Sequence, residues 1–239
     1  MTTIWKQKNG VLATFLTREL EDSYGVVQKL TSLPSDEEEL QALETNRQIV
    51  SRVFDIPGID LAMGKQIHGT HISYAMQMGI HDNTDGLVTD RSGIALAVLV
   101  ADCAALLLVD RVNKVAAAAH AGWRGAADGI ASAVLERMTY LGAEPDLVEC
   151  YISPCISLAR FEVGEEVAAR FPSRFVDRSG LKPHVDLQGF LTAELIQNGV
   201  PHDLIVADGR CTFIGSGNLH SYRRDGEAAG RMMAAVVLT

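Results

Sequence analysis

The chain has 239 residues, of which 47% are hydrophobic and only 6% aromatic, and its formal net charge at pH 7 is −9. This length allows a sizeable, mostly aliphatic core without disulfides, whereas the acidic balance argues against binding to nucleic acid or to a membrane, because both attract basic surfaces. The first residues lack the apolar core and cleavage site typical of a signal peptide, the longest apolar run is too short to span a bilayer, and the four cysteines show no disulfide framework. We therefore expect a cytoplasmic monomer with reduced thiols.

The first third of the chain contains a predicted strand, a helix and further strands. Val11–Thr17 is an apolar strand. The helix covers residues 36–54, where apolar residues recur at helical intervals; Ser35 can cap it, and Glu38 completes a capping box. Further strands are expected within Ile59–Met76 and, after a turn at Asp85–Gly86, at Leu87–Thr89.

The middle of the chain holds two apolar runs, Val98–Val109 and Val115–Ala119, which are too short for soluble helices and which we predict to be buried strands. A turn at Asp110–Asn113 would place Cys103 directly opposite His120. Opposed side chains have Cβ atoms about 4.5–5.5 Å apart, close enough to share a metal ion or to exchange a proton. A slip of one residue would put the two side chains on opposite faces of the pair.

The remaining elements alternate irregularly, and neither an internal repeat nor a phosphate-binding glycine loop is present. The predicted helices are Gly125–Gly142, Phe161–Phe171 and Val185–Asn198. The predicted strands are Val148–Ile152, Ile205–Ala207 and Ala234–Leu238. We therefore expect a single α/β (α+β mixed) domain over residues 1–239, with mixed, largely antiparallel sheets layered with helices.

Three side chains are candidate metal ligands: His68, Cys103 and His120. Neutral imidazoles and one thiolate suit zinc, and three protein ligands with one open position are typical of a catalytic site. Alternatively, Cys103 is a nucleophile that His120 activates, with Asp102 or another acid orienting the imidazole. A third interpretation is an inert core thiol with two histidines whose hydrogen bonds are satisfied.

Several arginines are candidate anion contacts. Arg124 lies where a helix begins, and the exposed N–H groups there favour an anion. Arg223 and Arg224 are adjacent and offer bidentate donors for phosphate or carboxylate. Because neighbouring residues of a strand point in opposite directions, at most one of them should face a pocket. Each arginine could instead form a surface salt bridge.

A set of short motifs follows in a fixed order: Gln66–Thr70, Ala101–Cys103, His120–Gly125, Phe161–Gly164, Cys211–Thr212, Ser221–Asp225 and Gly230–Arg231. Their combination resembles the laccase-domain or polyphenol-oxidase family (YfiH-like), also called peptidoglycan editing factor or purine nucleoside phosphorylase. The resemblance covers the chain from about Asn46 to its end. It implies that His68, Cys103 and His120 bind one Zn²⁺.

The resemblance implies more than one activity. Members are associated with phosphorolysis of adenosine, inosine and methylthioadenosine and with adenosine deamination. Alternatives are a hydrolase that removes L-serine from a nucleotide-linked muropeptide precursor and a copper-dependent polyphenol oxidase. A multicopper cluster needs many histidines, commonly in His-x-His pairs, whereas this chain has seven histidines and no such pair. A single Cu²⁺ on the same ligands stays open, as does a non-enzymatic module with a fully ligated metal.

The sequence therefore leads us to expect a zinc-dependent enzyme acting on a purine nucleoside with phosphate. We expect catalytic roles for His68, Cys103, His120, Arg47 and Asp102, with Asp102 supporting the metal ligands from behind. Substrate contacts are expected from Arg224, Arg124 and Gln66.

The chain departs from the family pattern in three places: residues 19–32 replace glycine-rich segments, the usual Ile-Gly-Pro-Cys reads Ile152–Cys155 with Ser153 in place of glycine, and His220 replaces an aromatic residue. If these segments shape the pocket, they alter substrate choice and leave the metal ligands unchanged.

Overall fold

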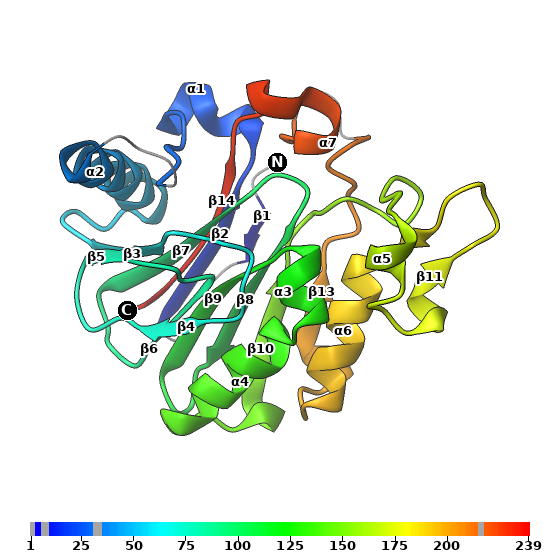
Figure 1. Ribbon diagram of the computed structural model, residues 1–239. Helices are drawn as coiled ribbons and strands as arrows, with labels where there is room; N and C mark the ends of the chain where they lie inside the picture. Colours follow the sequence, from blue (N-terminus) through cyan, green and yellow to red (C-terminus); the bar gives the residue numbers. More distant parts are fainter. Residues whose placement is uncertain (1–2, 6–9, 31–34, 215–217) are drawn as a thin grey trace.

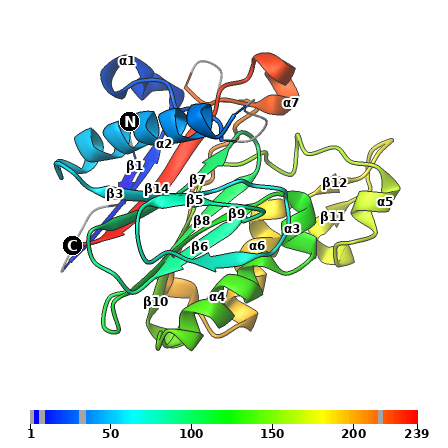
Figure 2. The ribbon, with the colours of Figure 1, turned by 60° about the vertical axis from the view of Figure 1, so that its left-hand side comes forward.

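The computed structural model describes residues 3–5, 10–30, 35–214 and 218–239. Two six-stranded sheets pack face to face, and helices cover their outer faces (Figures 1 and 2). Seven of the eleven strand pairings in the described residues are antiparallel and four are parallel. The predicted mixed α/β class with largely antiparallel sheets is confirmed. None of the helices in these ranges is long and apolar enough to cross a membrane.

The first sheet has the order β1-β2-β14-β7-β3-β5. Its strands are β1 (Thr3–Trp5), β2 (Val11–Leu16), β14 (Met232–Leu238), β7 (Ile94–Val100), β3 (Asp60–Gly64) and β5 (Gly79–His81). The second sheet has the order β13-β10-β8-β9-β6-β4. Its strands are β13 (Ile205–Ala207), β10 (Val148–Ile152), β8 (Ala104–Asp110), β9 (Val115–Ala121), β6 (Gly86–Thr89) and β4 (Ile72–Tyr74). A small separate sheet pairs β11 (Val176–Asp177) with β12 (His184–Val185).

The helices vary in length. They are α1 (Glu21–Tyr24), α2 (Asp36–Phe54), α3 (Trp123–Ala127), α4 (Ile130–Tyr140), α5 (Glu165–Ala168), α6 (Leu187–Gln197) and α7 (Tyr222–Asp225). Helix α2 covers the first sheet, and α4 and α6 cover the second (Figures 1 and 2). The predicted cap of α2 is confirmed, because the Ser35 hydroxyl accepts a hydrogen bond from the Glu38 amide at 3.3 Å.

The apolar character of the central strands follows from burial on both faces. Every residue of β7 is buried; Leu96 and Val98 pack into the layer between the two sheets, whereas Ala97 and Leu99 pack beneath α2. Strands buried on both faces have nearly continuous apolar sequences. The shared layer between the sheets supports our proposal that residues 1–239 form one domain.

Two expectations for the central hairpin are wrong. The run Val98–Val109 is not one strand, because the chain bends through Ala101–Cys103 and passes from the first sheet to the second. The turn between β8 and β9 spans four residues, so His120 pairs with Ala105 and not with Cys103. The Asp110 side chain stabilises the longer turn by accepting hydrogen bonds from the amides of Val112 and Asn113 at 2.9 Å. Because the register differs by two residues, both candidate ligands keep the same sheet face.

Two predicted helices are also shorter than expected. Gly125–Gly142 is divided into α3 and α4 by Gly129, which has a φ of 90° and so interrupts the right-handed helix. Within Phe161–Phe171 only α5 is helical, because the preceding residues are extended: the Val163 amide donates to the carbonyl of Pro183 at 2.9 Å.

Candidate metal centre

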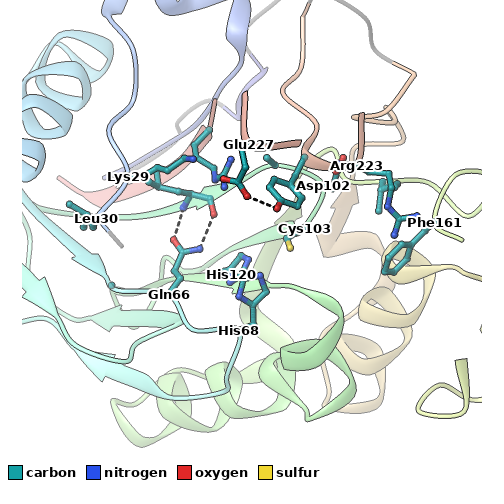
Figure 3. A pocket seen from close by; sticks show the side chains of 16 residues that line it. Lys29, Leu30, Gln66, His68, Asp102, Cys103, His120, Phe161, Arg223 and Glu227 are labelled. Carbon is teal, nitrogen blue, oxygen red and sulfur yellow. Dashed lines mark hydrogen bonds between the residues drawn. The ribbon is translucent and has the colours of Figure 1, made fainter. Parts of the chain in front are cut away.

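The three predicted ligands converge from three separate segments (Figure 3). His68 lies in the loop between β3 and β4, Cys103 in the bend before β8, and His120 in β9. One ligand atom from each lies within 4.8 Å of the others, and the imidazole rings are 4.7 Å apart between centroids. Tetrahedral zinc with these donors needs ligand atoms about 3.3–3.6 Å apart, which is a small contraction of this group.

Asp85 organises this group from behind. The side chain is fully buried, and its Oδ1 lies 2.8 Å from Nδ1 of His120 and accepts a hydrogen bond from the His68 amide at 2.9 Å. Its Oδ2 accepts from the amides of Ile67 at 3.1 Å and Gly69 at 2.7 Å. Because Asp85 occupies Nδ1 of His120, Nε2 is the nitrogen left for a metal. A carboxylate behind a ligating histidine sets its tautomer and orientation.

Gly122 leaves the space between the ligands open. A Cβ atom at this position would lie 2.8 Å from Cδ2 of His68 and 3.1 Å from Sγ of Cys103. Any other residue would therefore push the ligands apart. The absent Cβ and the carboxylate behind His120 both fit a metal bound by His68, Cys103 and His120.

The electrostatics favour the ligating form of the cysteine. Burial alone would raise the pKa of the Cys103 thiol, but the charge and hydrogen bonds of His120, together with those of His68, outweigh burial and lower it. Burial likewise opposes protonation of His120, but the Cys103 thiolate and Asp85 raise the pKa of its imidazole. The thiolate is the form that binds a metal and that acts as a nucleophile.

The same contacts would suit a nucleophilic cysteine, because Asp85, His120 and Cys103 form a connected series. His68 distinguishes the two interpretations. A nucleophile needs one imidazole, whereas here a second imidazole lies beside the sulfur within ligand distance. The arrangement therefore favours the metal site.

A cavity of about 590 Å³ opens above the ligands. This volume is within the range of small-molecule sites, about 300–1,000 Å³. Two aromatic side chains, Phe161 and Tyr222, line the cavity, as do three cationic side chains, Lys29, Arg223 and Arg231. Figure 3 shows Lys29 on one side and Arg223 with Phe161 on the other, with the ligands between them.

Gln66 lines the cavity, but its amide is engaged with the backbone. Its Nε2 donates to the Leu99 carbonyl and its Oε1 accepts from the Leu99 amide, both at 2.8 Å (Figure 3). The pair ties the loop of His68 to the end of β7. Gln66 therefore positions a ligand loop, and its expected substrate contact stays a prediction.

Asp102 also lines the cavity, but its position differs from the expected one. Its carboxylate accepts hydrogen bonds from Oγ1 of Thr212 at 2.5 Å and from the Arg223 amide at 2.6 Å. These contacts hold α7 against the bend before β8. The carboxylate that contacts a metal ligand is Asp85, which the sequence indicated only as part of a turn.

Three predicted arginines do not line the cavity. Arg47 pairs with Glu44 at 2.6 Å, and Arg124 lies over the ring of Trp123, 4.4 Å from its centroid. Arg224 donates to backbone carbonyls, including that of Leu219 at 2.9 Å, and to the Asp225 carboxylate at 2.7 Å. Their expected catalytic and substrate roles have no support in this geometry.

Other cationic side chains line the cavity instead of these three arginines. Arg223 faces it while Arg224 does not, although the segment is the helix α7 and not a strand. Arg231 belongs to the Gly230–Arg231 motif, from which the sequence predicts no particular role. Lys29 lies in the segment that departs from the family pattern, so no sequence signal pointed to it.

Comparisons with known proteins identify the family of this chain. The model of the family described as multi-copper polyphenol oxidoreductase laccase matches residues 12–239. A protein of Deinococcus radiodurans named purine nucleoside phosphorylase is 37% identical over 198 residues, which cover 81% of this chain and 76% of that protein. A protein from an unknown prokaryotic organism named adenosine deaminase RL5 is 32% identical over 195 residues, 74% of each chain.

Solved structures show the same fold. The Neisseria meningitidis protein NMB0706 has a TM-score of 0.79 and 31% identity and covers 100% of this chain and 98% of its own. The YfiH protein of Bacillus licheniformis has a TM-score of 0.84 at 24% identity, covering 96% of this chain and 93% of that one. With a family model that matches nearly the whole chain, the protein belongs to the multi-copper polyphenol oxidoreductase laccase family.

Proposed function

We propose that this protein is a zinc-dependent enzyme that cleaves purine nucleosides by phosphorolysis and deaminates adenosine at the same site. One observation carries the proposal: the group of His68, Cys103 and His120 lies at the floor of a cavity that aromatic and cationic side chains also line. The names of the relatives, purine nucleoside phosphorylase at 37% identity and adenosine deaminase at 32% identity, support it.

The cavity offers suitable contacts for each part of such a substrate. The rings of Phe161 and Tyr222 provide faces on which a purine base can stack. Arg223 lies over the Phe161 ring, 5.8 Å from its centroid, and its Nη1 donates to the Glu162 carbonyl, which holds the guanidinium beside this surface. Asp85 keeps the His120 imidazole in one tautomer. When bound, zinc would supply a water of lowered pKa or polarise an oxygen of the substrate.

Zinc is the proposed metal because of the donor set. Two imidazoles and one thiolate with an open position are typical of catalytic zinc, although such ligands also bind copper. Within the described ranges, these three residues form the one group of three or more potential ligands. The other histidines therefore do not assemble a second such site there, and the chemistry of a multicopper cluster has no support. A single Cu²⁺ remains the alternative.

The partner of this site is proposed to be a small molecule, namely a purine nucleoside together with phosphate. Binding to nucleic acid or to a membrane is not proposed, because the net charge is −9. The monomeric state and the cytoplasmic location stay predictions.

The test combines metal analysis with product analysis. Purified protein should contain zinc, release hypoxanthine from inosine only when phosphate is present, and form inosine from adenosine without phosphate. His68→Ala should abolish zinc binding and both reactions, whereas His202→Ala, at an exposed position outside the cavity, should change neither. If zinc-loaded protein converts neither nucleoside, the proposed function is wrong.

A further inference from the structure

The cationic side chains that line the cavity form no direct ion pairs within the part of the chain that the structure describes. Among the described residues, no ion pair involves Lys29, Arg223 or Arg231, whereas Lys65 pairs with Glu39 and Arg224 pairs with Asp225. The chain has 30 acidic and 21 basic residues, so acidic partners are plentiful. These three side chains therefore line the cavity without a directly paired carboxylate.

The segment that carries Lys29 is anchored to α2 by hydrogen bonds and by apolar packing. Asn46 is fully buried; its Oδ1 accepts from the Gln28 amide and its Nδ2 donates to the Gln28 carbonyl, both at 2.8 Å. Val27 and Leu30 are buried in the core beneath α2. Lys29, between these anchors, lines the cavity (Figure 3). The backbone of an otherwise irregular segment is thus fixed on both sides of this lysine.

Arg231 lies close to the same wall of the cavity. It directly precedes β14, whose first residue, Met232, pairs with Val100 of β7. Leu30, the neighbour of Lys29, packs in the same cluster as Leu99 of β7. Because both cations adjoin this end of the β7–β14 pair, we assign them to one side of the cavity. Arg223 lies with Phe161 on the other side (Figure 3).

The Arg231 guanidinium is oriented by the backbone. Its Nη1 donates to the carbonyls of Ala229 at 3.0 Å and Gly230 at 2.9 Å, and its Cζ lies 5.9 Å from the ring centroid of Tyr222. These contacts use Nη1 and leave the remaining N–H donors for a ligand. A fixed guanidinium beside a flexible ammonium suits a tetrahedral anion with several acceptor oxygens.

We propose that Lys29 and Arg231 bind the phosphate group of the substrate pair. This inference rests on the proposed function and deepens it, because it assigns the anion site to a segment in which this chain departs from its family pattern. The carboxylates of Glu227 and Asp102 also line the cavity, but Glu227 accepts a hydrogen bond from Tyr222 at 2.8 Å and Asp102 from Thr212 and Arg223. The phosphate group that binds there belongs either to inorganic phosphate or to the 5′-phosphate of a nucleotide. The experiment distinguishes these two sources.

The experiment measures binding by calorimetry to the zinc-loaded protein, so that it does not depend on turnover. The ligands are inorganic phosphate, adenosine and adenosine 5′-monophosphate. The variants are Lys29→Gln and Arg231→Gln, which remove one charge each and keep a long polar side chain. Arg52→Gln is the control, because it removes one charge from the exposed surface of α2, outside the cavity.

Each variant should weaken phosphate binding by about tenfold, as expected for the loss of one charge-assisted contact, and leave adenosine binding within about twofold. If the site serves a nucleotide, adenosine 5′-monophosphate should bind wild type more tightly than adenosine does, and the variants should lose this advantage. The assignment is wrong if both variants bind phosphate and the nucleotide as the control does.

Failure of the assignment differs from failure of the proposed function. If inosine is cleaved in a phosphate-dependent way by wild type and both variants show an unchanged KM for phosphate, the function stands and the site lies elsewhere. If phosphate binds at Lys29 and Arg231 but inosine is not cleaved, the site stands and the proposed phosphorolysis is wrong.

Discussion

Asp85→Asn tests whether the carboxylate behind His120 organises the metal centre. The wild-type carboxylate has four contacts: Nδ1 of His120 and the amides of Ile67, His68 and Gly69. Asparagine has nearly the same shape as aspartate but only one acceptor oxygen. Its NH₂ group therefore faces N–H donors where the carboxylate offered its second oxygen. If the NH₂ group faces Ile67 and Gly69, both of these contacts are lost; if it faces His68, that contact is lost and the His120 contact persists only when the imidazole accepts at Nδ1. With one or two buried donors unsatisfied at about 1–3 kcal/mol each, apo protein should lose roughly 1–6 kcal/mol of unfolding free energy.

The same change should weaken zinc binding. Removal of a carboxylate partner from a ligating histidine typically lowers metal affinity about 10–100-fold. Competition with a chromophoric chelator measures the affinity, and urea unfolding of the apo protein measures the stability. Asp82→Asn is the matched control, because this carboxylate is exposed and lies in the neighbouring turn. Zinc affinity of Asp85→Asn within twofold of the control would refute the role assigned to Asp85.

Two further predictions follow from the geometry. Gly122→Ala places a methyl group 2.8 Å from His68 and 3.1 Å from Cys103, so zinc affinity should fall at least tenfold with little change in the circular dichroism spectrum. Gly209→Ala, where a Cβ meets nothing within 4 Å, is its control, and equal zinc affinity of the two variants would contradict this reading. For Asp110, burial opposes ionisation, but hydrogen bonds from Asn113, Glu144 and Val112 outweigh it and lower the pKa of the carboxyl. Its stabilising contribution is present above the unfolded pKa of about 3.9 and is lost as the pH falls through the folded value. Urea unfolding should therefore show a lower free energy of unfolding for Asp110→Asn than for wild type at pH 7, and a smaller difference near pH 2. An equal difference at both pH values would show that ionisation of Asp110 contributes nothing to stability.

Local features of the sequence were sufficient for several elements. The Ser35 cap and the apolar periodicity that follows it predict α2, which spans Asp36–Phe54. Val148–Ile152 is a strand as expected. The polar and apolar pattern of these segments depends on neighbouring residues, so it can be read without knowledge of the fold.

The hairpin of Cys103 and His120 shows where local reasoning fails. An apolar run buried on both faces has no alternation, so nothing in it marks the bend through Ala101–Cys103 or the transfer between sheets. Turn length was equally undetermined, since the four-residue turn depends on the hydrogen bonds of Asp110. The error of two residues preserved the face, and the two ligands still meet.

The sequence by itself determined the chemistry available to this protein: two imidazoles and a thiolate of types that bind zinc, in motifs that resemble one family. Only the tertiary structure decided what surrounds them. Asp85 lies 17 residues from His68 and 35 from His120 along the chain, and Lys29 reaches the cavity because Asn46, on another element, binds the backbone beside it. Such contacts join segments with no local pattern in common, so they exist only once the sheets and helices have packed.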